Sequence, residues 1–174
     1  MSQLKQLNNL EALLEFYALY TSITPKQEVE SFDRFSKWAT IVLQDFNEID
    51  RHLVDPVKIF NYLSAIQEIN HWSLDPSPTK MIRGYLKFWK QVSRYYAAFS
   101  EYLLNQGLGY QGLIYKNAID NLETYLQSTK RKKHIFIGFN ALNAAESRII
   151  QALLHHEIAE VFWDADKLFL ESPY

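Results

Sequence analysis

Five basic residues recur three and four positions apart in a segment that also carries a stripe of aromatic residues. They are Lys80, Arg83, Lys87, Lys90 and Arg94. At this spacing they share one face of a helix, and the aromatic residues that include Tyr85 lie on the opposite face. Lysine and arginine displace counterions from phosphates, so this basic face predicts contact with a nucleic acid backbone. A solvated helix face is the alternative interpretation of the same pattern.

The charge is distributed unevenly along the chain. Residues 79–133 hold ten basic and three acidic residues, whereas residues 28–55 hold seven acidic and three basic ones. The net charge is only −2, but a nearly neutral protein with one basic region can hold a polyphosphate on that side. The candidate DNA contacts are therefore Lys80, Arg83, Lys87, Lys90, Arg94, Lys130, Arg131, Lys132 and Lys133.

Three aromatic residues of the same helical segment could stack on nucleic acid bases if their rings are exposed. They are Tyr85, Trp89 and Tyr96. Base stacking needs an accessible ring face, but aromatic residues at helical spacing usually fill a core. We expect these three rings to belong to the core.

Other residues that could do chemistry give weaker patterns. Asp164 and Asp166 follow an apolar segment at the position where open parallel sheets bind ligands, although a turn would also explain them. His155 and His156 are adjacent, so on a helix they point about 100° apart and make a poor metal site. The chain has no cysteine, no glycine-rich phosphate loop and no GxSxG motif. We predict no catalytic residue, no metal and no cofactor.

The composition is that of a folded, soluble chain. Of 174 residues, 48% are hydrophobic, and only five are glycine and five proline, which excludes a disordered or collagen-like protein. A chain of this length can bury a core without disulfides or metals. No apolar run is long enough to span a bilayer and the first residues do not resemble a signal peptide, so we expect a cytoplasmic protein without a membrane partner.

Apolar periodicity predicts helices over most of the chain. The expected helices cover residues 4–20, a segment starting near residue 31, and residues 56–70, 79–106 and 111–127. Residues 73–78 contain two prolines and predict a loop, after which Thr79 is a suitable N-cap.

The pattern changes after residue 133. A short apolar run at 135–139 and another at 159–163 predict two buried strands. Between them, Asn143 followed by Glu146 predicts a helix that begins with a capping box. A strand, a helix and a strand within this length form one βαβ unit with a parallel sheet. The predicted fold is therefore α/β but mainly helical, with a small parallel sheet near the C-terminus.

Residues 134–170, HIFIGFNALNAAESRIIQALLHHEIAEVFWDADKLFL, resemble the part of bacterial AddB-type helicase/nuclease proteins that holds the Walker B strand of a superfamily 1 helicase core. Residues 31–56 and 107–122 are similar to the helical insertion that precedes this strand in PD-(D/E)XK nuclease family proteins of the same type. The motifs that carry the resemblance are the Gly138-Phe139-Asn140 turn with Glu146, and the run from Asp45 to Asp50.

The resemblance implies a motor segment that has lost its catalytic groups. In an active helicase of this superfamily the Walker B strand ends in Asp-Glu, whereas the degenerate Walker B-like positions here are Ile137, Gly138, Phe139 and Asn140. None of these side chains is a carboxylate that binds Mg²⁺. Asp164 and Asp166 occupy positions similar to a nucleotide-sensing motif and are expected to be vestigial. The set of acids and lysine of a PD-(D/E)XK nuclease centre is not recognisable either.

These expectations define two parts and two functions. Residues 1–130 are expected to form an insertion-like helical subdomain and residues 131–174 a βαβ unit resembling a partial helicase core, in a fragment of a longer protein. The function implied by the resemblance is a non-catalytic segment of a DNA repair and recombination helicase/nuclease that contributes scaffold and DNA contact. The alternative is a protein–protein interaction module without a nucleic acid role. The expected partners are the rest of the parent chain or a helicase/nuclease partner subunit, and DNA.

Overall fold

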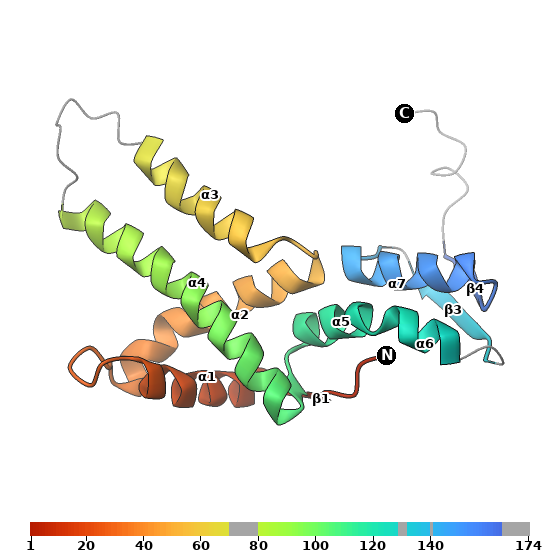
Figure 1. Ribbon diagram of the computed structural model, residues 1–174, viewed down its shortest axis with the longest axis horizontal. Coiled ribbons are helices and arrows are strands. Elements are labelled where there is room, and N and C mark those ends of the chain that lie inside the picture. Colours follow the sequence, from red (N-terminus) through yellow and green to blue (C-terminus); the bar gives the residue numbers. More distant parts are fainter. Residues whose placement is uncertain (70–79, 129–131, 140, 165–174) are drawn as a thin grey trace.

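The computed structural model describes residues 1–69, 80–128, 132–139 and 141–164. In these ranges the chain is mainly helical, and its strands pair as two small parallel sheets (Figure 1). The helices are α1 (Asn9–Ile23), α2 (Phe32–Arg51), α3 (Pro56–Ile69), α4 (Lys80–Gln106), α5 (Gln111–Asp120), α6 (Leu122–Ser128) and α7 (Ala144–His155). The strands are β1 (Lys5–Gln6), β2 (Leu108–Gly109), β3 (His134–Phe139) and β4 (Ala159–Trp163). A mainly helical fold with a parallel sheet near the C-terminus is confirmed.

The core of the first four helices consists largely of aromatic rings. Phe16 of α1, Phe35 and Phe46 of α2, and Phe99 of α4 are fully buried. The ring centroid of Phe16 lies 5.0 Å from that of Phe99 and 5.2 Å from that of Phe35. Burial of each large apolar side chain contributes about 2 kcal/mol, so these contacts hold the three helices together.

Helices α3 and α4 run side by side along one side of the molecule (Figure 1). Both helices agree with the ranges predicted from apolar periodicity. The predicted loop at 73–78 and the expected N-cap Thr79 lie outside the described residues. At the other end, Gly107 has a φ of +69°, which ends α4 and turns the chain into β2.

The first residues do not form the helix that was predicted from residue 4. Lys5 and Gln6 instead form β1, which pairs in parallel with β2. The helix begins later because the side chain of Asn8 accepts hydrogen bonds from the backbone N–H groups of Leu10 and Glu11, and Glu11 completes a capping box. An N-cap fixes the first helical residue, so the leucine periodicity before it is not helical.

The single helix predicted over residues 111–127 is divided into α5 and α6. The division falls at Asn121, whose side-chain Nδ2 donates a 2.8 Å hydrogen bond to the carbonyl of Asn117. Asparagine side chains compete in this way with the backbone hydrogen bonds of a helix. Leu113 of α5 belongs to the main core, whereas Leu122 and Leu126 of α6 belong to the apolar cluster of the βαβ unit. The apolar periodicity nevertheless continues through the break, and so the sequence pattern did not indicate it.

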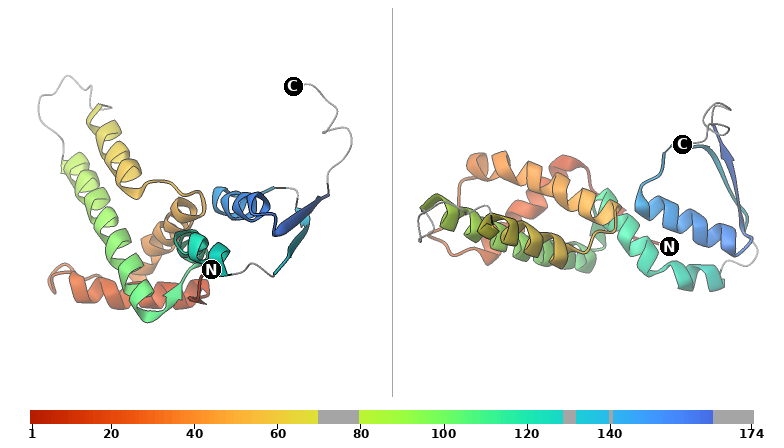
Figure 2. Two further views of the ribbon diagram at one scale, coloured as in Figure 1. Left: turned by 45° about the vertical axis from the view of Figure 1, so that its right-hand side comes forward. Right: turned by 90° about the horizontal axis from the view of Figure 1, so that it is seen from above.

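The predicted βαβ unit is present at the C-terminal end of the described chain. β3 and β4 pair in parallel, with Phe136 opposite Val161 and Ile137 opposite Phe162. Helix α7 connects them and begins at the predicted capping box of Asn143 and Glu146. Figure 2 shows α7 lying along one side of this sheet, next to α5 and α6.

The βαβ unit has its own apolar cluster. Leu122 and Leu126 of α6 are buried together with Leu153 of α7 and Ala159 of β4. α7 also contacts α5 and α2, and the hydroxyl of Tyr115 donates a 3.1 Å hydrogen bond to the carboxylate of Glu146. Helix α6 therefore belongs to the core of the βαβ unit, although it precedes the boundary expected at residue 130. In the described parts of the chain, every helix is too short or too polar to cross a bilayer.

Candidate functional site

One face of the β3–β4 sheet is open to solvent and carries three large apolar side chains. Alternate residues of a strand point to opposite faces, so Ile135, Ile137, Glu160 and Phe162 share one face, which we call the open face. Ile135 is 59% exposed, Ile137 73% and Phe162 54%. Parallel sheets are normally covered on both faces, yet α7 covers only the opposite face here. The open face thus lacks a covering layer in the described chain.

The edges of this sheet are also open. It consists of two strands within the described residues, so each strand has one edge without a neighbour. A two-stranded sheet is only marginally stable alone, and unpaired strand edges readily accept another strand. The open face and its edges together have the properties of a surface that another polypeptide completes.

The predicted glycine turn lies beside the open face. The register of the two strands shifts between Ile137 and Phe139, and the intervening Gly138 has a φ of +80°. A side chain at this φ would be strained, so the bulge requires glycine. Of the Walker B-like positions, Ile137 and Gly138 are exposed and Phe139 is half-buried, whereas Asn140 lies outside the described residues.

The basic residues predicted on α4 differ in their surroundings. Lys90 and Arg94 are exposed, but Lys87 places its Nζ 3.5 Å from the carboxylate of Glu28. The side chains of Lys80 and Arg83 lie outside the described part of the chain. Of the three described cations on the predicted basic face, Lys87 is thus paired with Glu28, whereas Lys90 and Arg94, one turn apart, form no ion pair with another described side chain.

The basic run before β3 is separate from α4. Lys132 is exposed, and Lys133 forms a 2.5 Å ion pair with Glu160 on the open face. Lys130 and Arg131 lie outside the described residues. Figure 1 shows that β3 and the middle of α4 lie on opposite sides of the molecule, so these two groups do not form one continuous patch.

The structure places two of the three candidate stacking residues in or against the core. Tyr96 is buried and Trp89 packs against the main core, as expected for aromatic residues at helical spacing. The side chain of Tyr85 is outside the described part. Stacking of bases on Tyr96 is therefore excluded, because no face of its ring is accessible.

The acidic pair predicted after β4 is described only in part. Asp164 is exposed directly after the strand, whereas Asp166 lies outside the described residues. His155 ends α7 and His156 is its C-cap. Within the described ranges, no three His, Cys, Asp or Glu side chains lie close enough to hold a metal ion.

A buried polar network surrounds Asp50 and was not predicted from the sequence. This aspartate is 1% exposed, and its Oδ2 accepts a 2.6 Å hydrogen bond from the hydroxyl of Tyr110. Its Oδ1 accepts hydrogen bonds from the hydroxyl of Tyr96 and, at 3.2 Å, from the Nζ of Lys116. The signal was present in the sequence, because Asp50 continues the stripe of buried residues that contains Phe46. An acid at such a position must find buried partners.

The pKa values in this network keep its hydroxyls protonated. Burial, reinforced by the charge of Asp50, raises the pKa of Tyr96 to about 12 and raises the pKa of Tyr110 well above its usual value. Burial alone would lower the pKa of Lys116, but its hydrogen bond to Tyr96 and the charge of Asp50 together raise it. At neutral pH the two tyrosines and the lysine therefore act as hydrogen-bond donors to Asp50.

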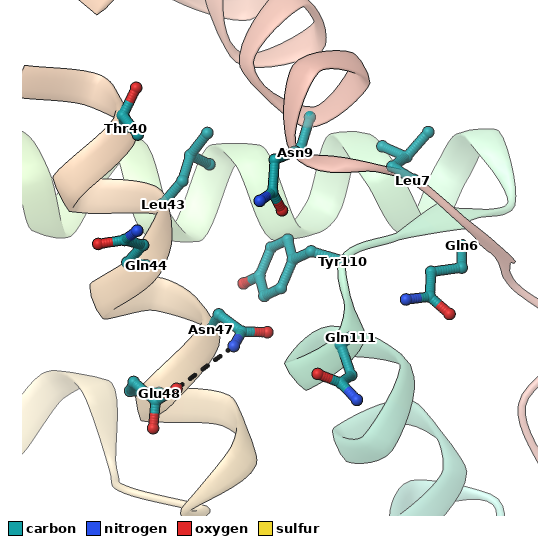
Figure 3. A pocket seen from close by; sticks show the side chains of 11 residues that line it. Gln6, Leu7, Asn9, Thr40, Leu43, Gln44, Asn47, Glu48, Tyr110 and Gln111 are labelled. Carbon is teal, nitrogen blue, oxygen red and sulfur yellow. Dashed lines mark hydrogen bonds between the residues drawn. The ribbon is translucent and has the colours of Figure 1, made fainter. Parts of the chain in front are cut away.

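A hollow of about 460 Å³ adjoins this network and is shown in Figure 3. The ring of Tyr110 lies among the side chains of Asn9, Gln44 and Asn47, while the hydroxyl of Tyr110 is bonded to Asp50. Asp50 does not line this hollow, and its side chain has no exposed surface. The hollow thus offers neutral amides and the carboxylate of Glu48 to a ligand, whereas the buried carboxylate of Asp50 beside it joins helices.

Comparisons with known proteins identify no relative. No protein-family model, curated protein or solved structure matches this chain.

Proposed function

We propose that this chain is a protein–protein interaction module whose βαβ unit is completed by another polypeptide. The observation that carries the proposal is the open face, on which Ile135, Ile137 and Phe162 are each more than half exposed. Exposed side chains of this size on one small sheet mark an interaction site or an aggregation liability. The partner would be an α/β layer from the rest of a longer parent chain or from a partner subunit.

A site-specific photo-crosslinker tests this proposal in the cells that contain the protein. Placed at Ile137 or Phe162, it should yield one discrete adduct with the same partner. The matched control is Ile41, which is 60% exposed but lies on α2 rather than on the sheet. The adduct should disappear when Phe162→Lys is added to the crosslinker at Ile137. Equal adducts from Ile41 and Ile137 would contradict the proposal.

A second function, DNA contact by a non-catalytic helicase-like segment, is supported by Lys90 and Arg94. Both side chains are exposed on one face of α4, and neither forms an ion pair among the described residues. Two phosphate contacts give only weak, strongly salt-dependent binding, so this function would also need the basic residues outside the described ranges. The helicase kinship itself remains a proposal that depends on the sequence resemblance.

A salt titration separates the second function from the first. Binding to single- or double-stranded DNA should weaken steeply with salt and be lost in the Lys90→Glu, Arg94→Glu variant. The control is the Lys5→Glu, Lys37→Glu variant, which carries the same change in net charge on exposed residues elsewhere. Equal losses of DNA affinity in the two variants would show that binding depends only on the net charge of the protein. An absence of DNA binding at low salt would exclude DNA contact.

A further inference from the structure

A second hollow, of about 340 Å³, lies between the loop after α1 and the facing sides of α2 and α4. Four aromatic rings line it, those of Tyr20, Trp38, Phe88 and Tyr95. The centroid of Trp38 is 5.9 Å from those of both Tyr20 and Phe88, with the rings nearly perpendicular. Aromatic faces carry partial negative charge, so walls of this kind attract cations with apolar surroundings.

The carboxylates of Glu28 and Glu30 line this aromatic hollow, and hydrogen bonds fix the loop that carries them. The hydroxyl of Tyr20 donates a 3.2 Å hydrogen bond to the carbonyl of Glu28 and accepts a 3.1 Å hydrogen bond from the N–H of Glu30. The hydroxyl of Tyr17 binds the carbonyl of Glu30. The side chain of Glu30 accepts a 2.9 Å hydrogen bond from Nε1 of Trp38. The position of Glu30 is therefore fixed from its backbone and from its carboxylate.

One cation of the protein already lies at the hollow. The Nζ of Lys87 is 3.5 Å from Oε1 of Glu28, and both side chains are largely exposed. An exposed ion pair of this length contributes little to stability and is easily displaced. Lys87 thus shows that the position accepts a positive charge, and an incoming cation can replace it.

The chemistry of the lining selects one kind of ligand. Glu28 and Glu30 repel anions, and within the described residues no third His, Cys, Asp or Glu side chain joins them to make a site for a divalent metal ion. Aromatic walls with acids at the rim favour a positive charge surrounded by methyl or methylene groups. We propose that this hollow binds an alkylated ammonium group, which would come from a free small molecule or from a methylated lysine side chain of another protein.

Titrations followed by NMR test this proposal through the indole N–H resonance of Trp38, assigned by its loss in Trp38→Phe. The probes are tetramethylammonium, choline, a peptide containing trimethyllysine, and 3,3-dimethyl-1-butanol, a neutral molecule with the shape of choline. The three cations should shift the resonance at millimolar concentrations, and the neutral molecule should bind about tenfold more weakly. Tighter binding of a peptide containing trimethyllysine than of choline would identify a protein side chain as the ligand, and the reverse order a free small molecule.

Two variants with opposite expected effects distinguish binding from a loss of folding. Glu30→Gln keeps an acceptor for Trp38 but removes the charge, and should weaken choline binding about tenfold. Lys87→Gln removes the internal competitor and should strengthen binding about threefold. Lys90→Gln makes the same charge change outside the hollow and should leave the affinity unchanged. Equal affinity for choline and its neutral counterpart, or weaker binding by Lys87→Gln, would overturn the proposal.

Discussion

The hydroxyl of Tyr110 lies 2.6 Å from Oδ2 of Asp50, a residue sixty positions earlier in the chain. This contact joins the start of α5 to the end of α2. Because Tyr96 and Lys116 bind the other oxygen of the same carboxylate, one buried group links α2, α4 and α5. A buried network of this kind stabilises the fold only when all its members are satisfied.

Removal of the Asp50 carboxylate should therefore destabilise the whole helical part. Asp50→Ala leaves the buried hydroxyls of Tyr96 and Tyr110 without their acceptor and removes the charge partner of Lys116, and should lower the free energy of unfolding by about 3 kcal/mol. Asp50→Asn keeps an acceptor at nearly the same volume and should cost about half as much. Urea unfolding measures both, with the exposed Asp120→Ala as the control. A cost for Asp50→Ala no larger than the control would refute the structural role of the network.

The same network predicts a loss of stability at high pH. Burial and the charge of Asp50 raise the pKa of Tyr96 to about 12 in the folded protein, above the usual tyrosine value of 10.0. The unfolded state therefore loses this proton first, so the contribution is complete below the unfolded pKa and is lost as pH rises towards the folded pKa. The free energy of unfolding should fall more steeply with pH above 10.0 in the wild type than in Tyr96→Phe. Parallel pH profiles for the two proteins would show that Tyr96 does not contribute.

Gly112 marks the closest approach of α5 to α2. Its backbone N–H donates a 2.8 Å hydrogen bond to Oδ1 of Asn47, and a Cβ at this position would collide with the backbone carbonyl of the same residue. Gly112→Ala should therefore cost about 2 kcal/mol or more, since a backbone carbonyl cannot move aside as a side chain can. Urea unfolding of Gly112→Ala checks this value.

Gly107 provides the comparison for that variant. Its φ is +69° and nothing lies within 4 Å of a Cβ built there, so Gly107→Ala should cost only about 1 kcal/mol through backbone strain. A smaller effect for Gly112→Ala than for Gly107→Ala would mean that α2 and α5 can separate without penalty.

Local sequence signals predicted the elements well, whereas pairings between distant residues were not predictable. The capping box of Asn143 and Glu146 and the apolar periodicity of α4 involve only residues that are close in the sequence, and both are confirmed. The strand at Lys5–Gln6 is only two residues long, too short for any periodicity, and it exists because β2 lies beside it. Its formation depends on tertiary contact, which overrides the leucine spacing in the same segment.

The same holds for the candidate functional residues: their positions on helices were predictable from local patterns, but their distant partners were not. The spacing of the basic residues on α4 correctly placed Lys87, Lys90 and Arg94 on a helix, but no local rule pairs Lys87 with Glu28 in a distant loop. Likewise, the stripe of buried residues along α2 predicts that position 50 is buried. It does not identify which of the eleven tyrosines would bind Asp50. The open face was implied by the predicted βαβ unit, since a two-stranded parallel sheet with one helix leaves one face uncovered.

The N-cap of α7 gives a prediction specific to the βαβ unit. The side chain of Asn143 accepts a 2.9 Å hydrogen bond from the N–H of Glu146, while its Nδ2 is buried without a partner among the described residues. Asn143→Ala removes the cap and should cost about 1 kcal/mol or more. Asn143→Ser keeps an acceptor and removes the unpaired amide, so it should cost clearly less.

Hydrogen exchange shows where this stability is lost. Because α7 packs on the sheet, the amides of β3 and β4 should lose protection in Asn143→Ala, while those of α1 and α2 should not. Asn8→Ala removes the corresponding cap of α1 and should give the reverse pattern. If both variants reduced protection equally throughout, the βαβ unit and the helical part would unfold together as one cooperative unit.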